Sequence, residues 1–430
     1  MQITRRSMDP RDKPEDNVRE NAHVTWQHLW NRSTARDAND RLAACIQLAQ
    51  NAGLPQVLPS LESHRMTHSA RTPLWTWVVP VLGLLLFIEA TATSYGEDFS
   101  THTLGIVNTI LLIPLLIGAV FAAVYHAEDV AHIMGEPIGT LVLTVAVTII
   151  ELSLIISLML TGKATPTLVR ETVFAVIMIV TSGLVGLCIV VGGLRYREQS
   201  FDVTSAKIYL AMLIVLTTLT IILPNYTTTA PGRLYSESQL TYVSIVTIAL
   251  YLVFLYTQTV LHRGYFIGEQ IHPEATAGGE GKLALSAFFL CVALAAVVLL
   301  AKLIAVVINT GVSQLDAPSS ISGVIIALIV LTPESIAAVR AAQKDDLQKS
   351  LNLALGSSLA TIGLTIPAIA AANIFLHTPL VLGLEPGDEA LIVMTLAASI
   401  LTFGTGRTNV LFGFLHLVIF GTFLFLAFVP

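Results

Sequence analysis

Long apolar runs separated by short polar connections fill the chain from residue 73 to its end. Each run has about 18–25 residues, the length that a helix needs to cross the hydrocarbon core of a bilayer. Strands of a membrane barrel would instead alternate apolar and polar residues over roughly ten positions, and these runs do not. The pattern therefore predicts an all-α polytopic membrane protein with about 11 transmembrane helices. The expected spans are roughly 73–93, 103–125, 137–160, 171–194, 205–223, 240–261, 283–308, 319–340, 350–373, 388–404 and 409–428.

The composition indicates an integral membrane protein, and the sequence shows no motif of an intramembrane enzyme. Hydrophobic residues make up 54 % of the chain and charged residues 12 %, whereas a soluble domain has about 25 % charged residues. The cysteines Cys45, Cys188 and Cys291 show no metal-binding spacing, which argues against disulfide, zinc and iron–sulfur sites. Neither an HExxH nor a GxSxG motif occurs. We expect no resident cofactor and no nucleic-acid partner; the expected partners are lipid and transported ions, and a homo-oligomer is left open.

The distribution of Lys and Arg predicts the orientation in the membrane. With the N-terminus inside, 19 of the 23 basic residues lie on the inner side, three lie outside, and Lys302 falls within a span. Ten of the 19 belong to the polar tail 1–72, and without them the count is still nine to three. The positive-inside rule therefore places the N-terminus in the cytoplasm and the C-terminus outside, across the cell's inner (plasma) membrane. We expect the tail 1–72 to be cytoplasmic and partly disordered; Met66 is a second candidate start.

Two acidic residues, Glu151 and Glu334, lie deep inside apolar runs with similar surroundings. The first run reads TLVLTVAVTIIELSLIIS (140–157) and the second reads GVIIALIVLTPESIAAVR (323–340). A carboxylate at membrane depth is costly, so it is read by default as part of an ion or proton pathway. The two runs belong to the third and eighth expected spans, which cross the membrane in opposite directions. Inverted repeats of this kind are typical of transporters whose substrate site lies near the midplane.

Hydroxyl and small residues gather around both glutamates and in the spans that follow them. Hydroxyls and freed carbonyls can supply oxygen ligands, and small residues let helices approach closely. The predicted supporting oxygens are Thr148, Ser153, Thr332 and Ser335 beside the glutamates, and Ser182, Ser357, Ser358 and Thr361 in the following spans. Packing alone is the competing interpretation for any single residue. We favour a cation site for the cluster as a whole, with an unwound entry turn at Pro137 and Pro333, because proline removes a helix hydrogen bond.

The segment GEPIGTLVLTVAVTIIELSLI (135–155) and the partner segment from Leu331 to Ala372 resemble the two repeats of ChaA-type calcium/proton antiporters of the calcium/cation antiporter superfamily. The resemblance covers about residues 73–430. It implies a lone first helix followed by two inverted five-helix halves, with Glu151 and Glu334 as the central ligands. The implied organisation is a tail 1–72, a lone helix 73–93, a first repeat 103–261, a cytoplasmic linker 262–282 and a second repeat 283–430.

The chain also departs from that superfamily. Val147-Thr148 and Leu331-Thr332 replace a common Gly-Asn pair, and Ser182 and Thr361 replace an asparagine in the following spans. Two ionised glutamates match one Ca²⁺, whose six to eight oxygen ligands can have loose geometry. Without the cation, burial and mutual repulsion favour protonation of the pair. We therefore expect proton-driven export of Ca²⁺ by alternating access, with one Ca²⁺ exchanged for two or more protons.

Other interpretations stay open at this stage. Na⁺/H⁺ or K⁺/H⁺ exchange could use the same site with one carboxylate protonated, and a cation channel is the less favoured alternative. Glu128, Asp129 and Glu136, with His132, cluster between the second and third spans, where they either gather cations or form a solvated loop. His416 is interpreted as a packed polar residue, and Glu171 as an interfacial charge.

Overall fold

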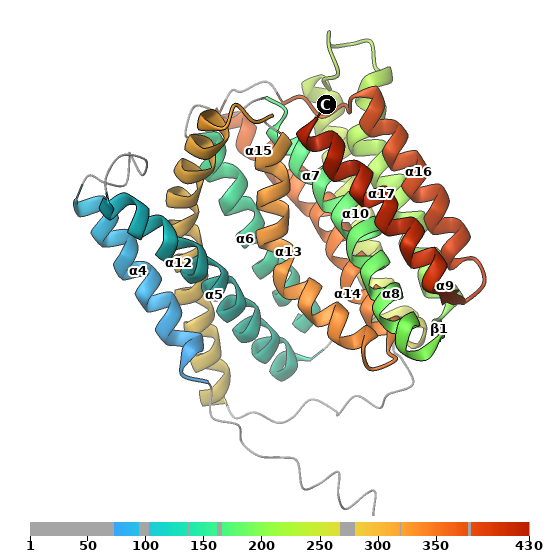
Figure 1. Cartoon of the computed structure of the whole chain (residues 1–430), viewed down its shortest axis with the longest axis horizontal. Coiled ribbons are helices and arrows are strands. Elements are labelled where there is room, and N and C mark those ends of the chain that lie inside the picture. The colour runs from blue at the N-terminus through green and yellow to red at the C-terminus, as the bar shows by residue number, and fades with distance from the viewer. Residues whose placement is uncertain are drawn as a thin grey trace, which may run out of the picture. The chain divides into compact units, whose positions relative to one another are not determined.

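Eleven helical segments of the described chain are long and apolar enough to cross a membrane, as the sequence predicts (Figure 1). The computed structural model describes residues 73–93, 103–135, 138–160, 166–266, 280–318, 320–376 and 380–429. The predicted tail 1–72 and much of the predicted linker 262–282 lie outside these ranges, as do Glu136 and Pro137. Residues from Pro73 onward form one compact unit.

The spans follow one another in this order. They are α4 (Trp75–Ala92), α5 (Thr103–Met134), α6 (Ile138–Leu160), α7–η3–α8 (Leu168–Met178, Ile179–Leu184, Val185–Tyr196), α9–η4–η5 (Val203–Thr217, Thr218–Ile222, Leu223–Tyr226), α10–η6 (Glu237–Tyr256, Thr257–Leu261), α12 (Glu280–Gln314), α13 (Ser320–Ala342), α14–η7–α15 (Leu347–Ala360, Thr361–Thr365, Ile366–Leu376), α16 (Pro386–Phe403) and α17 (Val410–Phe428). A short helix α11 (Arg263–Phe266) precedes the undescribed part of the linker.

Helices α4, α5 and α12 pack on one another at one side of the molecule, and α6 joins them to the remaining helices (Figure 1). Helices α5 and α12 have 32 and 35 residues. At ~1.5 Å per residue they are longer than the ~30 Å hydrocarbon core, so they either tilt or extend beyond it. Lys282 of α12 forms an ion pair with Asp129 of α5 at 3.1 Å, and Ser286 donates a hydrogen bond to the same carboxylate. Polar contacts therefore tie these two helices together at one end.

The second span is longer than expected, which changes the surroundings of three charged residues. The sequence predicts an end near 125, whereas α5 continues to Met134 and Gly135 follows with φ +68°. Glu128, Asp129 and His132 are consequently helical, and the prediction that they lie in a loop between spans is wrong. The physical reason is that 126–134 contains neither Gly nor Pro, and the helix ends at a glycine in the left-handed conformation.

Proline does not unwind the eighth span. Helix α13 continues through Pro333 to Ala342, so the expected break at that residue is wrong. The irregular backbone lies in other spans: η4 and η6 of the fifth and sixth spans have π-helical hydrogen bonding, and so do η3 and η7 in the spans that follow the glutamates. Such π segments occur frequently at functional sites. Segments η3 and η7 share a Gly-Leu pair that follows a threonine: TSGL at 181–184 and TIGL at 361–364.

Close helix packing encloses the fourth span, α7–η3–α8, in which 94 % of the most apolar stretch is buried. A Cβ atom added at Gly186 would lie 3.0 Å from the carbonyl oxygen of Gly413 in α17. A Cβ atom at Gly323 of α13 would lie 2.8 Å from the backbone of Glu171 in α7. Small residues in these spans thus permit backbone-to-backbone contact, which is the packing role that the sequence indicates.

Two short strands were not predicted. Strand β1 (Glu198–Ser200) follows α8 and pairs antiparallel with β2 (Arg407–Asn409), which precedes α17. The pair connects the loop after the fourth span with the loop after the tenth, at the ends predicted to face the cytoplasm. Three-residue strands carry too little alternation to be recognised in a sequence.

Candidate cation and proton site

Glu151 is held by hydroxyl groups from the opposite half of the chain. Its side chain lies in the middle of α6 and is 2 % exposed. Its Oε2 atom accepts a hydrogen bond from Thr361 at 3.0 Å and another from Thr365 at 2.9 Å. Its Oε1 atom is buried and has no hydrogen-bond partner among the described atoms. One oxygen of this carboxylate is therefore fixed by protein donors, and the other is free to bind a ligand.

Glu334 lies close enough to Glu151 for their charges to interact. It is carried by α13, is partly exposed, and its Oε2 atom is buried without a hydrogen-bond partner in the described part of the chain. The carboxylates of Glu128 and Glu151 both act electrostatically on that of Glu334. Helix α6 contacts both α13 and η7. The fold thus places the two helices that carry the acidic residues in contact, next to the π segment of the second half.

The predicted supporting hydroxyls divide into two groups. Thr361 contacts a glutamate, whereas the hydroxyls of Thr148, Ser153 and Thr332 donate to carbonyl oxygens of their own helices at 2.6–2.9 Å. Such hydroxyls keep their lone pairs, so this bonding is compatible with cation binding.

Of the remaining four predicted hydroxyls, three belong to the spans that follow the glutamates, and Ser335 follows Glu334 directly in α13. Ser182 is buried and lies 3.3 Å from the hydroxyl of Thr395 in α16. Ser358 is fully buried, and its hydroxyl has no partner among the described atoms. Ser335 and Ser357 are partly exposed. Only Thr361 among the predicted hydroxyls is seen on a carboxylate in the described structure.

Thr365 is the site residue that sequence reasoning missed. It lies four residues after Thr361, on the same face of the helix, and it is fully buried. That spacing is the signal that could have identified it, because residues four apart in a helix are neighbours.

The charged residues at the predicted inner end have different surroundings. Glu128 is exposed and interacts electrostatically with His132, Lys349 and Glu334. Asp129 is instead paired with Lys282 and Ser286 of α12. Glu136 lies outside the described residues. Of the three carboxylates, Glu128 is the one that the structure relates to the central pair.

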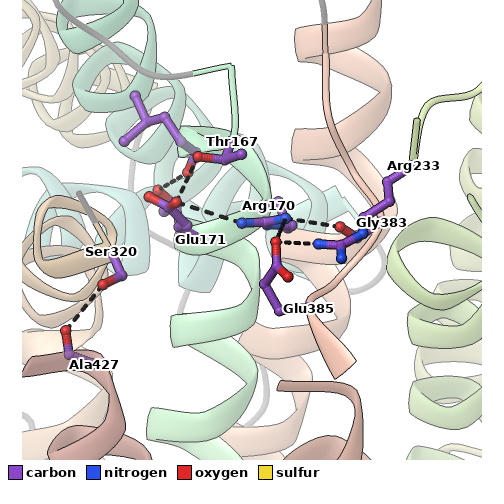
Figure 2. Close-up of polar contacts among 10 residues, drawn as sticks. Thr167, Arg170, Glu171, Arg233, Ser320, Gly383, Glu385 and Ala427 are labelled. Atoms are coloured by element: carbon purple, nitrogen blue, oxygen red, sulfur yellow. Dashed lines mark hydrogen bonds and ion pairs between the residues drawn. The ribbon is translucent and has the colours of Figure 1, made fainter. Parts of the chain in front are cut away.

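A second polar cluster lies at the ends predicted to face outward (Figure 2). The guanidinium of buried Arg170 donates to the carbonyl oxygen of Gly383 at 3.0 Å and lies 3.7 Å from Glu171 and 3.5 Å from Glu385. Arg233 forms an ion pair with the same Glu385, and Thr167 donates to Glu171 at 2.6 Å. Glu171 is therefore part of a buried ion pair rather than a plain interfacial charge. This cluster joins the beginnings of α7 and α16.

Backbone contacts reinforce that end of the molecule. The amide of Leu384 donates to Ile221, that of Gly383 donates to Arg233, and that of Val381 donates to Pro166. Tyr235 donates to the carbonyl oxygen of Leu219 at 2.6 Å, and burial raises the pKa of this tyrosine to about 12, so it stays a donor at neutral pH. The segment before α16 is thus fixed to the loops of the first half.

The donor set consists of carboxylate and hydroxyl oxygens. No group of three or more His, Cys, Asp or Glu side chains within the described ranges could hold a metal ion. Two carboxylates with hydroxyl oxygens are hard ligands, which suit Ca²⁺ and other oxygen-preferring cations. The arrangement can bind a cation or protons on the same oxygens.

Comparison with known protein families supports a cation site in this chain. A model of the sodium/calcium exchanger protein family matches residues 104–260 and 285–429. The chain therefore belongs to this family of membrane cation antiporters, which are transporters and not enzymes. The two matched blocks fall on the two predicted halves.

Three individual relatives are similar to this chain, and the names of two of them refer to different transported ions. A Sinorhizobium fredii protein named only as an ionic transporter, y4hA, is 42 % identical over 373 residues, 86 % of this chain and 100 % of its own length. The sodium-potassium/proton antiporter ChaA of Escherichia coli is 35 % identical over 359 residues, 82 % of this chain and 95 % of its own. The Ca²⁺/H⁺ antiporter ChaA of Bacillus subtilis is 26 % identical over 200 residues, 45 % of this chain and 56 % of its own.

Solved structures share the fold. The structure of YfkE matches with a TM-score of 0.63 and 18 % identity, covering 83 % of this chain and 100 % of that one. The H⁺/Ca²⁺ exchanger CAX matches with a TM-score of 0.56 and 14 % identity, covering 81 % of this chain and 87 % of that one. The predicted membership of the calcium/cation antiporter superfamily and the predicted all-helical fold are both confirmed.

Proposed function

We propose that this antiporter exchanges a cytoplasmic cation for protons at a site whose central ligands are Glu151 and Glu334. The observation that carries the proposal is that Glu151 of the first half is hydrogen-bonded by Thr361 of the second half, with Glu334 in electrostatic range. Because each bare carboxylate oxygen can take either a cation or a proton, the two ions compete for the same atoms. This competition for the same oxygens is sufficient to couple cation transport to proton transport.

Export of Ca²⁺ is the first candidate for the transported ion. Two ionised glutamates carry a charge of −2, which one Ca²⁺ neutralises, and carboxylate, hydroxyl, carbonyl and water oxygens can complete its coordination. The Bacillus subtilis relative is named for Ca²⁺/H⁺ antiport. Exchange of one Ca²⁺ for two or more protons would be driven by the inward proton gradient. The protein would lie in the cell's inner membrane with its N-terminus in the cytoplasm. Alternating access would come from movement of the two halves around the fixed site.

Exchange of Na⁺ or K⁺ is the second candidate, and one relative favours it. The Escherichia coli protein named as a sodium-potassium/proton antiporter is matched over 95 % of its length. In this case one carboxylate would stay protonated while the other binds the monovalent ion. We assign Glu128 the role of attracting cations toward Glu334 from the inner side, whichever ion is transported.

Flux through the purified protein tests the proposal. The protein is reconstituted into liposomes with an imposed pH gradient, and Ca²⁺, Na⁺ and K⁺ are supplied in turn. We expect cation movement that dissipates the pH gradient and that saturates with cation concentration. Cation flux without proton movement would instead indicate a channel and contradict the proposal.

A further inference from the structure

The two halves of the site are chemically unequal. Alignment of the π segments on Gly183 and Gly363 pairs Thr181 with Thr361 and Val185 with Thr365. Thr361 and Thr365 both donate to Glu151, whereas Thr181 donates to Ile177 of its own helix at 2.5 Å and Val185 has no hydroxyl. The first half therefore lacks the second donor that the other half directs at a glutamate.

Two donors on one oxygen limit what Glu151 can offer to a cation. An ionised carboxylate has about four lone-pair sites, two on each oxygen. Thr361 and Thr365 occupy both sites of Oε2, at 3.0 and 2.9 Å, and Oε1 remains without a partner. Glu151 can therefore bind a cation through one oxygen but cannot chelate it with two. Calcium sites often use a bidentate carboxylate to reach six to eight oxygens.

We propose that Thr365 is a specificity-determining residue, which holds Glu151 as a one-oxygen ligand and so shifts the balance from Ca²⁺ toward monovalent cations. This inference rests on the proposed exchange at Glu151 and Glu334. Thr365 is fully buried and its only O–H is used on the carboxylate, so it acts by fixing Glu151. In the described structure, the charged groups that act electrostatically on Glu334 are Glu151 and Glu128.

The substitution Thr365→Val separates this role from simple packing. Valine has nearly the shape of threonine, and it stands at the equivalent position, Val185, of the other half. It removes one neutral hydroxyl oxygen and releases one lone pair of a charged carboxylate, which is the stronger ligand for Ca²⁺. A second oxygen of the charged carboxylate favours a divalent ion more than a monovalent one, so the substitution should shift the ion preference toward Ca²⁺.

The test measures the ratio of apparent affinities for Ca²⁺ and Na⁺ in proteoliposomes, by transport and by mutual competition. We expect Thr365→Val to raise the Ca²⁺:Na⁺ ratio about tenfold, the lower end of the ~10–100-fold effects of losing an outer partner of a metal ligand. Thr365→Ser keeps the hydroxyl and should keep the wild-type ratio. Thr220→Val is the matched control, because buried Thr220 donates to Leu216 of its own helix at 2.7 Å.

Each outcome decides one question. A Thr365→Val ratio equal to that of wild type, or an equal loss for both ions, overturns the role of Thr365. Failure of the wild-type protein to exchange any cation for protons overturns the proposed function instead. A fall in the Ca²⁺:Na⁺ ratio would show that the hydroxyl is a calcium ligand and would also refute the inference.

Discussion

Removal of the Arg170 side chain should destabilise the protein far more than removal of its neighbour Arg233. Arg170 is 6 % exposed, and it is paired with Glu171, whose side chain is 10 % exposed. Loss of one partner of a buried ion pair costs about 3–5 kcal/mol, because the other charge stays buried. Glu171 keeps a hydrogen bond from Thr167, so we expect Arg170→Met to cost about 3 kcal/mol, at the low end of that range.

Arg233 provides the matched comparison at the same carboxylate. Arg233 is 37 % exposed and Glu385 is 52 % exposed. Exposed ion pairs contribute about 0–1 kcal/mol, so Arg233→Gln should change stability by less than ~1 kcal/mol. The double variant Arg170→Met with Glu171→Gln should recover part of the loss, because Glu171 then carries no buried charge, although Asp388 still lacks the Arg170 charge that acts on it.

Unfolding in mixed micelles, followed as the mole fraction of SDS rises, measures these free energies. The reasoning predicts a large loss for Arg170→Met, a small one for Arg233→Gln and partial recovery in the double variant. Equal losses for the two single arginine variants, or no recovery on neutralising Glu171, would refute it.

Three further predictions follow from the same geometry. Glu128→Gln should raise the KM for the cation about 2- to 10-fold through loss of a nearby charge, and less at high salt; Asp129→Asn is its control, since Asp129 is already paired with Lys282. Gly186→Val should lower the thermal stability, with a cost of about 1–3 kcal/mol, because its side chain would meet the backbone of Gly413; an unchanged melting temperature would contradict the packing. Lower pH on the side where the cation binds should raise its KM with little change in kcat, because protons then occupy more of the carboxylates; a KM independent of pH would oppose direct competition.

The spans could be predicted, and two carboxylates within them could be singled out, because each is defined by a short stretch of sequence. A run of about 20 apolar residues has few alternatives to a membrane helix. A carboxylate within such a run is energetically costly, which indicates a functional role. The opposite directions of the helices that carry Glu151 and Glu334 follow from their places as the third and eighth spans, and the basic residues predict which ends face the cytoplasm.

Side-chain partners were harder to predict because they depend on which helices meet. Ser153 and Thr361 looked equivalent in sequence, yet one donates to its own helix and the other to Glu151. Thr365 was missed although it lies four residues after the predicted Thr361, because the partner that makes this spacing matter, Glu151 of α6, is far away in the sequence. Pro333 was expected to break α13, but helix packing tolerates a lost hydrogen bond, and the π-helical segments η3, η4, η6 and η7 lie in other spans.

Proton-coupled flux through Glu151→Gln and Glu334→Gln proteins tests the central claim most directly. Both variants, with Thr220→Val as a folded control, are reconstituted into liposomes with an imposed pH gradient, and cation uptake and internal pH are recorded together. We expect either glutamine substitution to abolish coupled exchange and the control to keep it. Wild-type exchange by either glutamine variant would contradict a site built on these two carboxylates.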